Sequence, residues 1–506
     1  MSDPSSSKFL RGALIASTAA LALFAGFAAA PALLSRQADA QEIVVAPPQG
    51  APMSFADLIE RVSPAVVSIS VRQRPDAAAA PTPEGLPPGF EEFFRGRPGR
   101  PGPAPTALGS GFFIDQNGTI VTNHHVVEGA EEITIRASDG RELRAEIVGS
   151  DELTDLAVLR ILGGGRFPYV TFADASHVRV GDWVVAVGNP FGLNGTATAG
   201  IVSAIGRRNP GSSAYVDFLQ IDAPINRGNS GGPTFDLNGR VIGVNSQIYS
   251  PTGGSVGIGF AIPSEVASRT VRQLLASGRV ARGWLGVSIQ AIDDDIARSL
   301  GLSETRGALV GNIVADSPAA RAGLRQGDVI LAFDGHDIAD NRDLTQRVGA
   351  AAIGRPARLD VLREGARRTL TIRLAERPSE QALAANATPT PPTAPAEPAE
   401  PESAGAAQSS LGLSVRPLNQ GERTRFALGP NEGGLVVTAV NPESDVAEKG
   451  LSPGDIILRA GDRAVRTAED LNTATDAARR AGRPLLLQVQ SRNGQRGYIA
   501  TETGAG

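Results

Sequence analysis

The chain has 506 residues, enough for two to four domains that each bury a core of their own. Its 48 lysines and arginines nearly balance 53 aspartates and glutamates, for a formal net charge of -5, and this excludes the broad basic surface of a nucleic-acid-binding protein. The chain contains no cysteine, which excludes disulfides, thiol catalysis and thiolate metal ligands. Any chemistry therefore has to come from other side chains.

The first 40 residues have the layout of an export signal. Basic residues precede an apolar run over 13–34, and ADA at residues 38–40 has the small-x-small pattern of a cleavage site. We therefore expect residues 1–40 to be a signal peptide that is removed after export. The alternative is an uncleaved anchor, because about 20 apolar residues can span a bilayer.

Residues 55–270, preceded by a short N-terminal segment over 41–54, predict an all-β domain. Apolar runs rich in β-branched residues, such as GFFI, TIVTN and LAVLRI, alternate with Gly, Asn, Asp and Pro, a pattern typical of a sandwich or barrel. The stretch 74–105 is too rich in Pro and Gly for a core element and predicts a long loop. Its own domain or a neighbouring subunit would have to cover the three phenylalanines in that loop, Phe90, Phe93 and Phe94.

The C-terminal part of the chain contains an internal repeat. SPAARAGLRQGDVILAFDG matches PESDVAEKGLSPGDIILRAGD at a constant offset of 127 residues, as from Gly327 to Gly454. The match predicts two copies of one domain, at 279–377 and 410–500. The Ala/Pro/Glu-rich segment between them, 378–409, lacks the apolar content to fold and predicts a semi-extended linker.

A candidate nucleophile lies in INRGNSGGP, residues 225–233. Ser230 lies among glycines, which open backbone angles closed to other residues and leave room for an approaching substrate. A tight turn here would also aim the amides of Gly228 and Ser230 at a developing oxyanion. The alternative interpretation is a glycine-rich turn that carries an incidental serine.

A nucleophilic serine needs a base, and histidine is the usual one. The chain has four histidines, namely His124, His125, His177 and His336. The adjacent pair in TNHHVV follows an apolar run of the β domain, whereas the other two lie in a polar turn and in the first repeat. If the backbone is extended there, neighbouring side chains point to opposite faces, and at most one of the pair faces the serine.

The third member of such a site would be a carboxylate that orients the imidazole. Asp155 in LTDLAVLRI directly precedes an apolar run and can be partly buried at the start of a strand. Spacing alone does not distinguish it from its rivals, which are Asp115, Asp151, Asp174, Asp182 and Asp222.

GSGFFIDQNGTIVTNHHVV, TDLAVLRI and INRGNSGGP occur in this order, and GVNSQI and GIGFAIP follow them. Together they resemble the HtrA/Deg family of chymotrypsin-like serine endoproteases. The resemblance extends over residues 55–500, since the two repeats look like the PDZ domains of the family's periplasmic members. It implies a mainly β protease domain of two six-stranded barrels, followed by two α+β PDZ domains, in a protein exported to the periplasm.

The resemblance also implies roles for single residues. It assigns the general base to His125, the orienting acid to Asp155, the nucleophile to Ser230, and the oxyanion donors to the amides of Gly228 and Ser230. Asn229 stands where pancreatic-type relatives carry an aspartate that pairs with a freshly cut N-terminus, so activation by N-terminal cleavage is not expected. We also expect Asn229 to take part in substrate binding.

Specificity and regulation follow from the same resemblance. Ile225 and Ile248 correspond to the primary pocket, which is then shallow, apolar and suited to small aliphatic side chains. Ile221, where relatives often carry threonine, is a departure with no interpretation. Arg207 matches the arginine of the family's sensor loop, although it also fits the description of one solvated arginine among several.

GWLGV at 283–287 resembles the loop by which a PDZ domain holds a peptide C-terminus on backbone amides. The peptide-binding residues expected there are Trp284, Leu285, Gly286 and Val287. LGLSV at 411–415 is the counterpart in the second copy.

The sequence therefore predicts an ATP-independent serine endoprotease for quality control of unfolded exported proteins. The alternative is a holdase chaperone or PDZ scaffold whose protease domain is mainly structural. No P-loop and no HExxH motif occurs, so no cofactor and no metal is expected. The expected partners are unfolded proteins and peptide C-termini, and the resemblance implies a homotrimer or larger homo-oligomer, without nucleic acid and without stable membrane insertion after signal cleavage.

Overall fold

The structure is a computed structural model. It describes residues 54–73, 106–174, 177–189, 195–208, 213–226, 228–250, 254–379, 382–383, 407–426, 428–429 and 432–503. By contacts the chain divides into Met1–Ser54 and Phe55–Gly506, and the following description concerns the second unit. The predicted signal peptide, the loop over 74–105 with its phenylalanines and most of the predicted linker lie outside the described residues.

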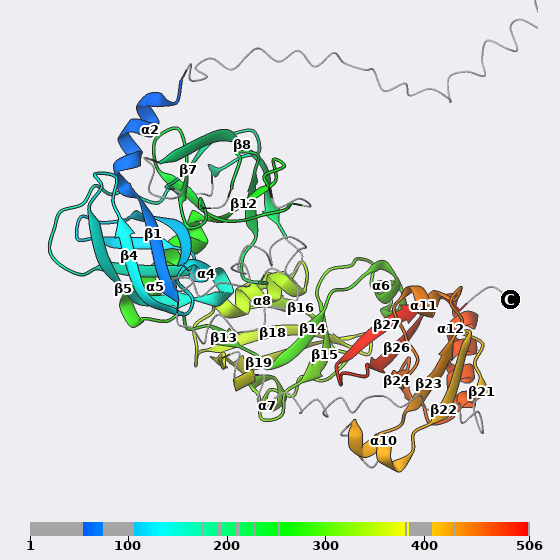
Figure 1. Cartoon of the computed structure of the whole chain (residues 1–506). Coiled ribbons are helices and arrows are strands. Elements are labelled where there is room, and N and C mark those ends of the chain that lie inside the picture. Colours follow the sequence, from blue (N-terminus) through cyan, green and yellow to red (C-terminus); the bar gives the residue numbers. More distant parts are fainter. Residues whose placement is uncertain are drawn as a thin grey trace, which may run out of the picture. The chain divides into compact units, whose positions relative to one another are not determined.

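Two closed six-stranded barrels form the protease domain, as predicted (Figure 1). The first has the strand order β1-β2-β3-β6-β5-β4 and the second β10-β11-β12-β9-β8-β7. The strands of the first barrel are β1 (Val66–Gln73), β2 (Thr106–Phe113), β3 (Thr119–Thr122), β4 (Ala130–Arg136), β5 (Glu142–Asp151) and β6 (Leu156–Ile161). Those of the second are β7 (Trp183–Gly188), β8 (Thr196–Arg207), β9 (Phe218–Ile221), β10 (Pro233–Phe235), β11 (Val241–Ile248) and β12 (Gly259–Pro263).

Alternation along the strands builds both the barrel interiors and the seam between the barrels. Phe113 belongs to the interior cluster of the first barrel and Val184 to that of the second. Their chain neighbours Phe112 and Val185 belong instead to one shared cluster. Because successive strand residues point to opposite faces, each barrel fills its own interior and contributes its outer face to the seam.

Short helices connect or follow the strands of this domain. They are α2 (Ala56–Val62), η2 (Ser63–Ala65), α4 (His124–Val127), η4 (Glu152–Thr154) and α5 (Ser264–Ser277). Helix α5 follows the last strand of the second barrel, and its Val271 and Leu274 pack in the shared cluster beside Val158 of the first. The described part of the chain contains no helix long and apolar enough to cross a membrane.

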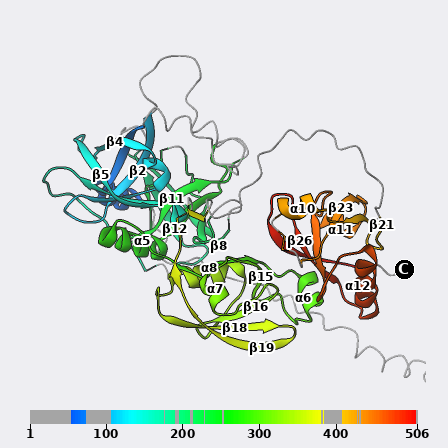
Figure 2. The same cartoon turned by 90° about the horizontal axis from the view of Figure 1, so that it is seen from below.

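Each of the two repeats folds as an antiparallel sheet covered by helices, in agreement with the predicted α+β class (Figures 1 and 2). The first contains β13 (Gly283–Trp284), β14 (Val287–Gln290), β15 (Ala308–Ile313), β16 (Val329–Phe333), β17 (His336–Asp337), β18 (Pro356–Arg363), β19 (Ala366–Arg373), β20 (Ala375–Glu376), α6 (Asp294–Leu300), α7 (Pro318–Arg321) and α8 (Asn341–Ala350). The second contains β21 (Ala407–Gln408), β22 (Leu413–Pro417), β23 (Leu435–Val440), β24 (Ile456–Ala460), β25 (Arg463–Ala464), β26 (Leu485–Gln490), β27 (Arg496–Thr501), α10 (Gln420–Arg425), α11 (Asp445–Glu448) and α12 (Ala468–Arg480).

The two repeat copies differ at one edge of the sheet. In the first copy β14 is the terminal strand of the order β14-β15-β16-β18-β19. In the second, the equivalent strand β22 has an additional neighbour, because β21 pairs with it antiparallel, Ala407 opposite Val415 and Gln408 opposite Ser414. Strand β21 comes from the end of the segment that the sequence predicts as a linker.

The two repeat copies also share an apolar cluster. Tyr498 of β27 packs with Ile296 of α6 and with Leu309 of β15. The Gln290 side chain donates to the carbonyl oxygen of Tyr498 (2.6 Å) and accepts from its amide (2.9 Å). Burial raises the pKa of Tyr498 to about 12.

Candidate active site

Asp155 binds the ring of His125. It follows η4 with a left-handed backbone (φ 54°) and directly precedes β6, the position that the sequence predicts. His125 Nδ1 lies 2.9 Å from each carboxylate oxygen of Asp155, and the His125 amide donates to Oδ1 at 3.1 Å. The His125 ring is thereby held with Nδ1 toward the carboxylate.

Two further residues hold Asp155, and sequence reasoning did not single out either of them. Ser246 of β11 donates its hydroxyl to Asp155 Oδ2 at 2.6 Å, and Asn123 donates its side-chain amide to the Asp155 carbonyl at 2.8 Å. The first barrel supplies Asn123 and His125, while the second supplies Ser246. A polar residue inside an apolar strand, as in GVNSQI, is the sequence signal that could have indicated Ser246.

The electrostatics of the pair favour a charged imidazole beside a charged carboxylate. Burial opposes the charge of His125, but the Asp155 carboxylate outweighs burial through its charge and its hydrogen bond, and the pKa of His125 is raised. Burial likewise opposes the charge of Asp155, but His125 and the hydroxyl of Ser246 outweigh it and lower the pKa of Asp155. A base that is stabilised once it gains a proton suits general base catalysis.

The two neighbouring histidines lie on a helical turn, since α4 comprises His124–Val127. The expectation of extended backbone, with the two rings on opposite faces, is therefore wrong. Residue Asn123, with β-region backbone, begins the turn, and this turn carries His125 to Asp155. The ring of His124 has a buried Nδ1 without a hydrogen-bond partner in the described part of the chain.

The other histidines and carboxylates lie elsewhere. His177 and Asp174 form a second pair at 3.9 Å, but both side chains are largely exposed. His336 lies on exposed β17 of the first repeat. Asp151 is held instead by Thr154 and by a buried ion pair with Arg282. The remaining rivals bind local amides or an arginine, and these are Asp115, Asp182 and Asp222.

The glycines around Ser230 are required by close approach as well as by backbone angle. Gly228 and Gly231 have φ of 96° and 83°, the left-handed region that favours glycine. A Cβ atom on Gly231 would lie 2.3 Å from the carbonyl oxygen of Ser110, and one on Gly232 would lie 2.3 Å from that of Val187. The turn is therefore wedged between the two barrels.

The turn places Ser230 beside the segment that carries His125. The Ser230 carbonyl accepts from the Ser110 amide at 2.9 Å, and a Cβ atom on Gly231 would lie 3.0 Å from the amide nitrogen of Asn123. Within the described part of the chain, the amides of Gly228 and Ser230 and the Ser230 hydroxyl donate no hydrogen bond. Catalytic hydrogen bonds are often long without substrate and tighten when it binds.

Asn229 differs in its surroundings from Ile221 and from the two isoleucines of the predicted pocket, Ile225 and Ile248. Asn229 is 2% exposed, its side-chain oxygen has no hydrogen-bond partner in the described residues, and it packs against Gly188. Any contact of Asn229 with substrate therefore rests on its backbone. Ile221, Ile225 and Ile248 belong to one apolar cluster, in which Ile221 and Ile225 are buried and Ile248 partly buried.

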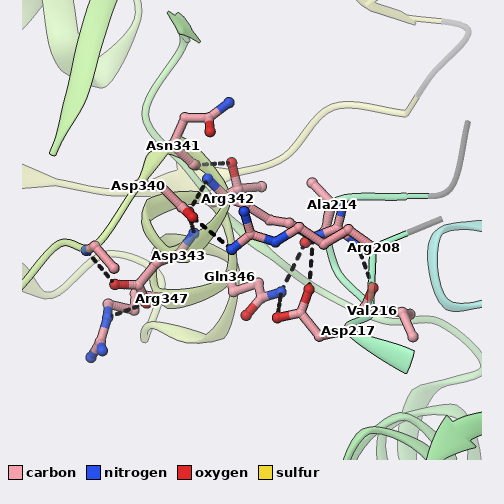
Figure 3. A network of polar contacts seen from close by, with 12 residues as sticks. Arg208, Ala214, Val216, Asp217, Asp340, Asn341, Arg342, Asp343, Gln346 and Arg347 are labelled. Atoms are coloured by element: carbon pink, nitrogen blue, oxygen red, sulfur yellow. Dashed lines mark hydrogen bonds and ion pairs between the residues drawn. The ribbon is translucent and has the colours of Figure 1, made fainter. Parts of the chain in front are cut away.

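The residues around Arg207 contact the first repeat. Arg207 is exposed at the end of β8, and its neighbour Arg208 forms an ion pair with Asp340 at 2.6 Å. Arg342 of α8 donates to the Asp217 side chain (2.8 Å) and to the carbonyl of Val216 (2.5 Å), as Figure 3 shows. Gln346, one turn further along α8, donates to the other oxygen of Asp217 at 2.9 Å.

The predicted carboxylate loop of the first repeat is well defined. Leu285 is buried, Gly286 has φ of 78°, and Val287 begins the edge strand β14. A Cβ atom on Gly286 would lie 2.2 Å from Ser317 Cβ, so close approach again requires glycine. The side chain of Trp284, on the short strand β13, is half-buried.

Known families match three parts of the chain. The trypsin-like peptidase domain matches residues 109–244, and the PDZ domain matches residues 283–374 and 409–503. The candidate residues Asp155, Ser230 and His125 all lie within the first match.

Similar proteins cover most of the chain. It is 43% identical over 518 residues to a "Probable periplasmic serine endoprotease DegP-like" of Brucella melitensis biotype 1, covering 95% of this chain and 96% of that protein. A protein of the same name from Rhizobium meliloti is 42% identical over 473 residues, covering 88% of this chain and 90% of that protein. Among solved structures, "HtrA-type protease AlgW with tripeptide" superposes with a TM-score of 0.56 at 38% identity, covering 65% of this chain and 99% of the other, and "HtrA-type protease AlgW with decapeptide" with 0.54 at 39%, covering 64% and 99%. This chain therefore belongs to the HtrA/DegP-like family of periplasmic serine endoproteases, with a trypsin-like protease domain and two PDZ domains.

Proposed function

We propose that Ser230, His125 and Asp155 perform peptide-bond hydrolysis through an acyl-enzyme. The observation that carries this proposal is the contact of His125 Nδ1 with both oxygens of Asp155 at 2.9 Å. It keeps Nδ1 as the donor toward the carboxylate, so Nε2 is the nitrogen that accepts a proton, the tautomer that a general base requires.

The reaction follows from these positions. Ser230 Oγ attacks the peptide carbonyl carbon while its proton passes to His125 Nε2, and Asp155 stabilises the resulting imidazolium. The amides of Gly228 and Ser230 donate to the oxyanion of the tetrahedral intermediate. His125 then protonates the leaving amine, the acyl-enzyme forms, and a water molecule activated by the same ring releases the second product.

We further propose a preference for small aliphatic residues on the acyl side of the cleaved bond. Ile225 and Ile248 pack in one apolar cluster, and a Cβ atom on Gly259 would lie 2.9 Å from the Ile225 side chain. A pocket without a charge offers no partner to lysine or arginine. Apolar pockets discriminate by only about 1–3 kcal/mol per methylene, so cleavage is broad and favours unfolded chains, which present extended backbone.

The first PDZ domain is the proposed receptor for peptide C-termini. Peptides bind PDZ domains by adding a strand to a sheet edge, and β14 is an edge strand. In the second PDZ domain β21 pairs with the equivalent strand, and Asn472 of α12 accepts from the Ser410 amide at 3.0 Å. That edge is therefore already occupied by the chain itself. The solved HtrA-type relatives contain a tripeptide or a decapeptide.

Quality control of unfolded proteins in the periplasm, under stress in particular, is the proposed physiological role. An expected homotrimer or larger assembly, and a regulatory role for Arg207 beside the PDZ contacts, belong to the same proposal. The contact of α8 with Asp217 supports the regulatory part, because it joins the peptide-binding domain to the protease domain.

A comparison of wild type with Ser230→Ala tests the catalytic proposal. Wild type is expected to degrade casein, an unfolded protein, and to take up a fluorophosphonate label, while Ser230→Ala does neither. Cleavage that persists in Ser230→Ala would overturn the assignment. A wild type that neither cleaves nor labels, yet suppresses aggregation of a denatured protein, would favour the holdase instead.

A further inference from the structure

Ser110 joins the first barrel to the turn that carries Ser230. It lies in β2, is 0% exposed, and belongs to the GSGFF stretch. Its amide donates to the Ser230 carbonyl at 2.9 Å, and its hydroxyl donates to the Gly228 carbonyl at 2.5 Å. The same hydroxyl accepts from the amide of Asn189, the residue that follows β7, at 2.8 Å.

These bonds fix three consecutive peptide units. The carbonyls of Gly228 and Ser230 bind Ser110, and the Asn229 carbonyl between them accepts from the Gly232 amide at 3.0 Å. Because a peptide unit is planar, a fixed carbonyl also fixes the N–H group of the next residue, so these bonds set the directions of the Asn229, Ser230 and Gly231 amides. Within the described part of the chain, the amides of Gly228 and Ser230 donate to no other group.

Gly228 is a residue of this turn whose own backbone conformation constrains the chain little. With φ of 96° it has a conformation that glycine leaves at little cost, so its own backbone does not hold the turn. Among the described residues, the Ser110 hydroxyl is the one donor to the Gly228 carbonyl. Without that hydroxyl, the peptide unit between Gly228 and Asn229 keeps one hydrogen bond among the described residues, from the Asn229 amide to the Asn226 carbonyl at 3.1 Å. The turn that directs the Ser230 amide is then held less firmly.

We propose that Ser110 is a positioning residue for the oxyanion hole: its hydroxyl and amide hold the carbonyls of Gly228 and Ser230, on either side of the peptide unit that carries the Ser230 amide, so that this amide stays aimed at the substrate oxyanion. The inference rests on the proposed function of Ser230. It adds to that function a residue of the other barrel that does not touch the substrate.

Ser110→Ala tests the inference with peptide substrates and with a peptide aldehyde. The aldehyde adds to Ser230 Oγ and forms a hemiacetal whose oxygen occupies the oxyanion hole, so aldehyde affinity reports on that hole. KM instead reports on binding of the substrate while its carbonyl is still uncharged. Loss of one oxyanion donor costs ~10²–10³-fold in kcat, so loss of its support is expected to lower kcat about 10- to 100-fold. KM stays within about twofold, and aldehyde affinity falls by the same factor as kcat/KM.

Ser68→Ala is the matched control. Ser68 is a buried serine directly opposite Ser110 in the β1–β2 register, and within the described part of the chain its side chain makes no hydrogen bond to the Ser230 turn. It is expected to retain wild-type kcat and aldehyde affinity. Equal losses in Ser68→Ala and Ser110→Ala would mean that buried polar packing is what matters, and would overturn the inference.

Ser110→Cys covers the case in which Ser110→Ala does not fold. A thiol is a weak donor of similar shape, so kcat and aldehyde affinity are expected between those of wild type and Ser110→Ala, again at constant KM. A folded Ser110 variant with wild-type kcat, or one that loses KM but not aldehyde affinity, contradicts the inference. An inactive wild type would instead refute the proposed function of Ser230.

Discussion

Asp155 is the residue on which the two barrels converge, since His125 approaches from the first and Ser246 from the second. Its left-handed backbone, at a position where the chain passes from η4 to β6, directs the carboxylate to both partners. The charge of this carboxylate sets the acid–base behaviour of the site.

A raised pKa of His125 predicts where activity is lost in acid. The ring must be neutral to accept the Ser230 proton, so kcat/KM is expected to fall as pH drops through a pKa above the ordinary 6.5. In Asp155→Asn, burial still lowers the pKa of His125, while the carboxylate charge that raises it is gone. The pH below which activity is lost is therefore expected to move down. The rate is expected to fall ~10⁴-fold, because the ring loses the partner that fixes its tautomer. A pH profile of kcat/KM for peptide hydrolysis measures both changes.

Asp174→Asn is the control for that experiment, because Asp174 forms the other histidine–carboxylate pair, with His177. Its profile is expected to match that of wild type. An acid limb that does not move in Asp155→Asn would contradict the proposed role of the carboxylate.

The histidine pair supplies a second prediction. His125→Ala is expected to lose nearly all turnover, since no other ring among the described residues contacts Asp155, whereas His124→Ala retains substantial activity. Casein hydrolysis and circular dichroism together measure turnover and fold. If folded His124→Ala and His125→Ala variants lose turnover equally, the contact with Asp155 is not what separates the roles of the two histidines.

Motif reasoning reached His125, Asp155 and Ser230 because each lies at the border of an apolar run, where side chains can be aimed. It missed Ser110 and Ser246, which lie inside strands and look in the sequence like ordinary small polar residues. Their contacts join segments more than 90 residues apart, and local pattern carries no information about such pairs.

At the scale of elements, the clearest difference between prediction and structure is α4. TNHHVV continues an apolar strand and was expected to be extended, but the chain turns helical at His124. Burial of Val126 and Val127 in the first barrel explains the turn, because their packing outweighs the preference of valine for strands. The repeat, by contrast, was predictable because two copies of one pattern reinforce each other.

Strand β21 supplies a prediction about the PDZ domains. Replacing both of its residues, Ala407→Pro with Gln408→Pro, removes two backbone donors and is expected to release β21 from β22. Titration of the full chain with a fluorescent C-terminal peptide should then rise from one site per chain to two. Gln408→Ala, which keeps the backbone donors, is the control, and an unchanged stoichiometry in the proline variant would mean that β21 does not close the second groove.

At the scale of the molecule, the apolar cluster around Tyr498 makes the two PDZ domains one packed unit despite the long segment between them. Tyr498→Ala removes a large side chain from this cluster, a change that costs about 3–5 kcal/mol when an aromatic residue is fully buried. The second PDZ domain is then expected to separate from the first and to unfold in a transition of its own. Differential scanning calorimetry measures this separation.

Tyr169→Ala is the control, because that tyrosine is exposed on the protease domain. Its unfolding profile is expected to stay close to that of wild type. A Tyr498→Ala variant that keeps the wild-type profile would mean that the cluster contributes little to the packing of the two domains.

The close fit of Gly231 and Gly232 against both barrels has a consequence for the moment at which a newly exported copy gains activity. Gly231 and Gly232 fit only against strands of both barrels, and Asp155 needs a donor from each, so a half-folded molecule has neither an aimed serine nor an oriented base. If the proposed site is correct, a nascent copy is therefore expected to be inactive toward its unfolded neighbours. Asn229 has no carboxylate to pair with a cut N-terminus, so the expected step that makes the proposed site active is the folding of both barrels and not N-terminal cleavage.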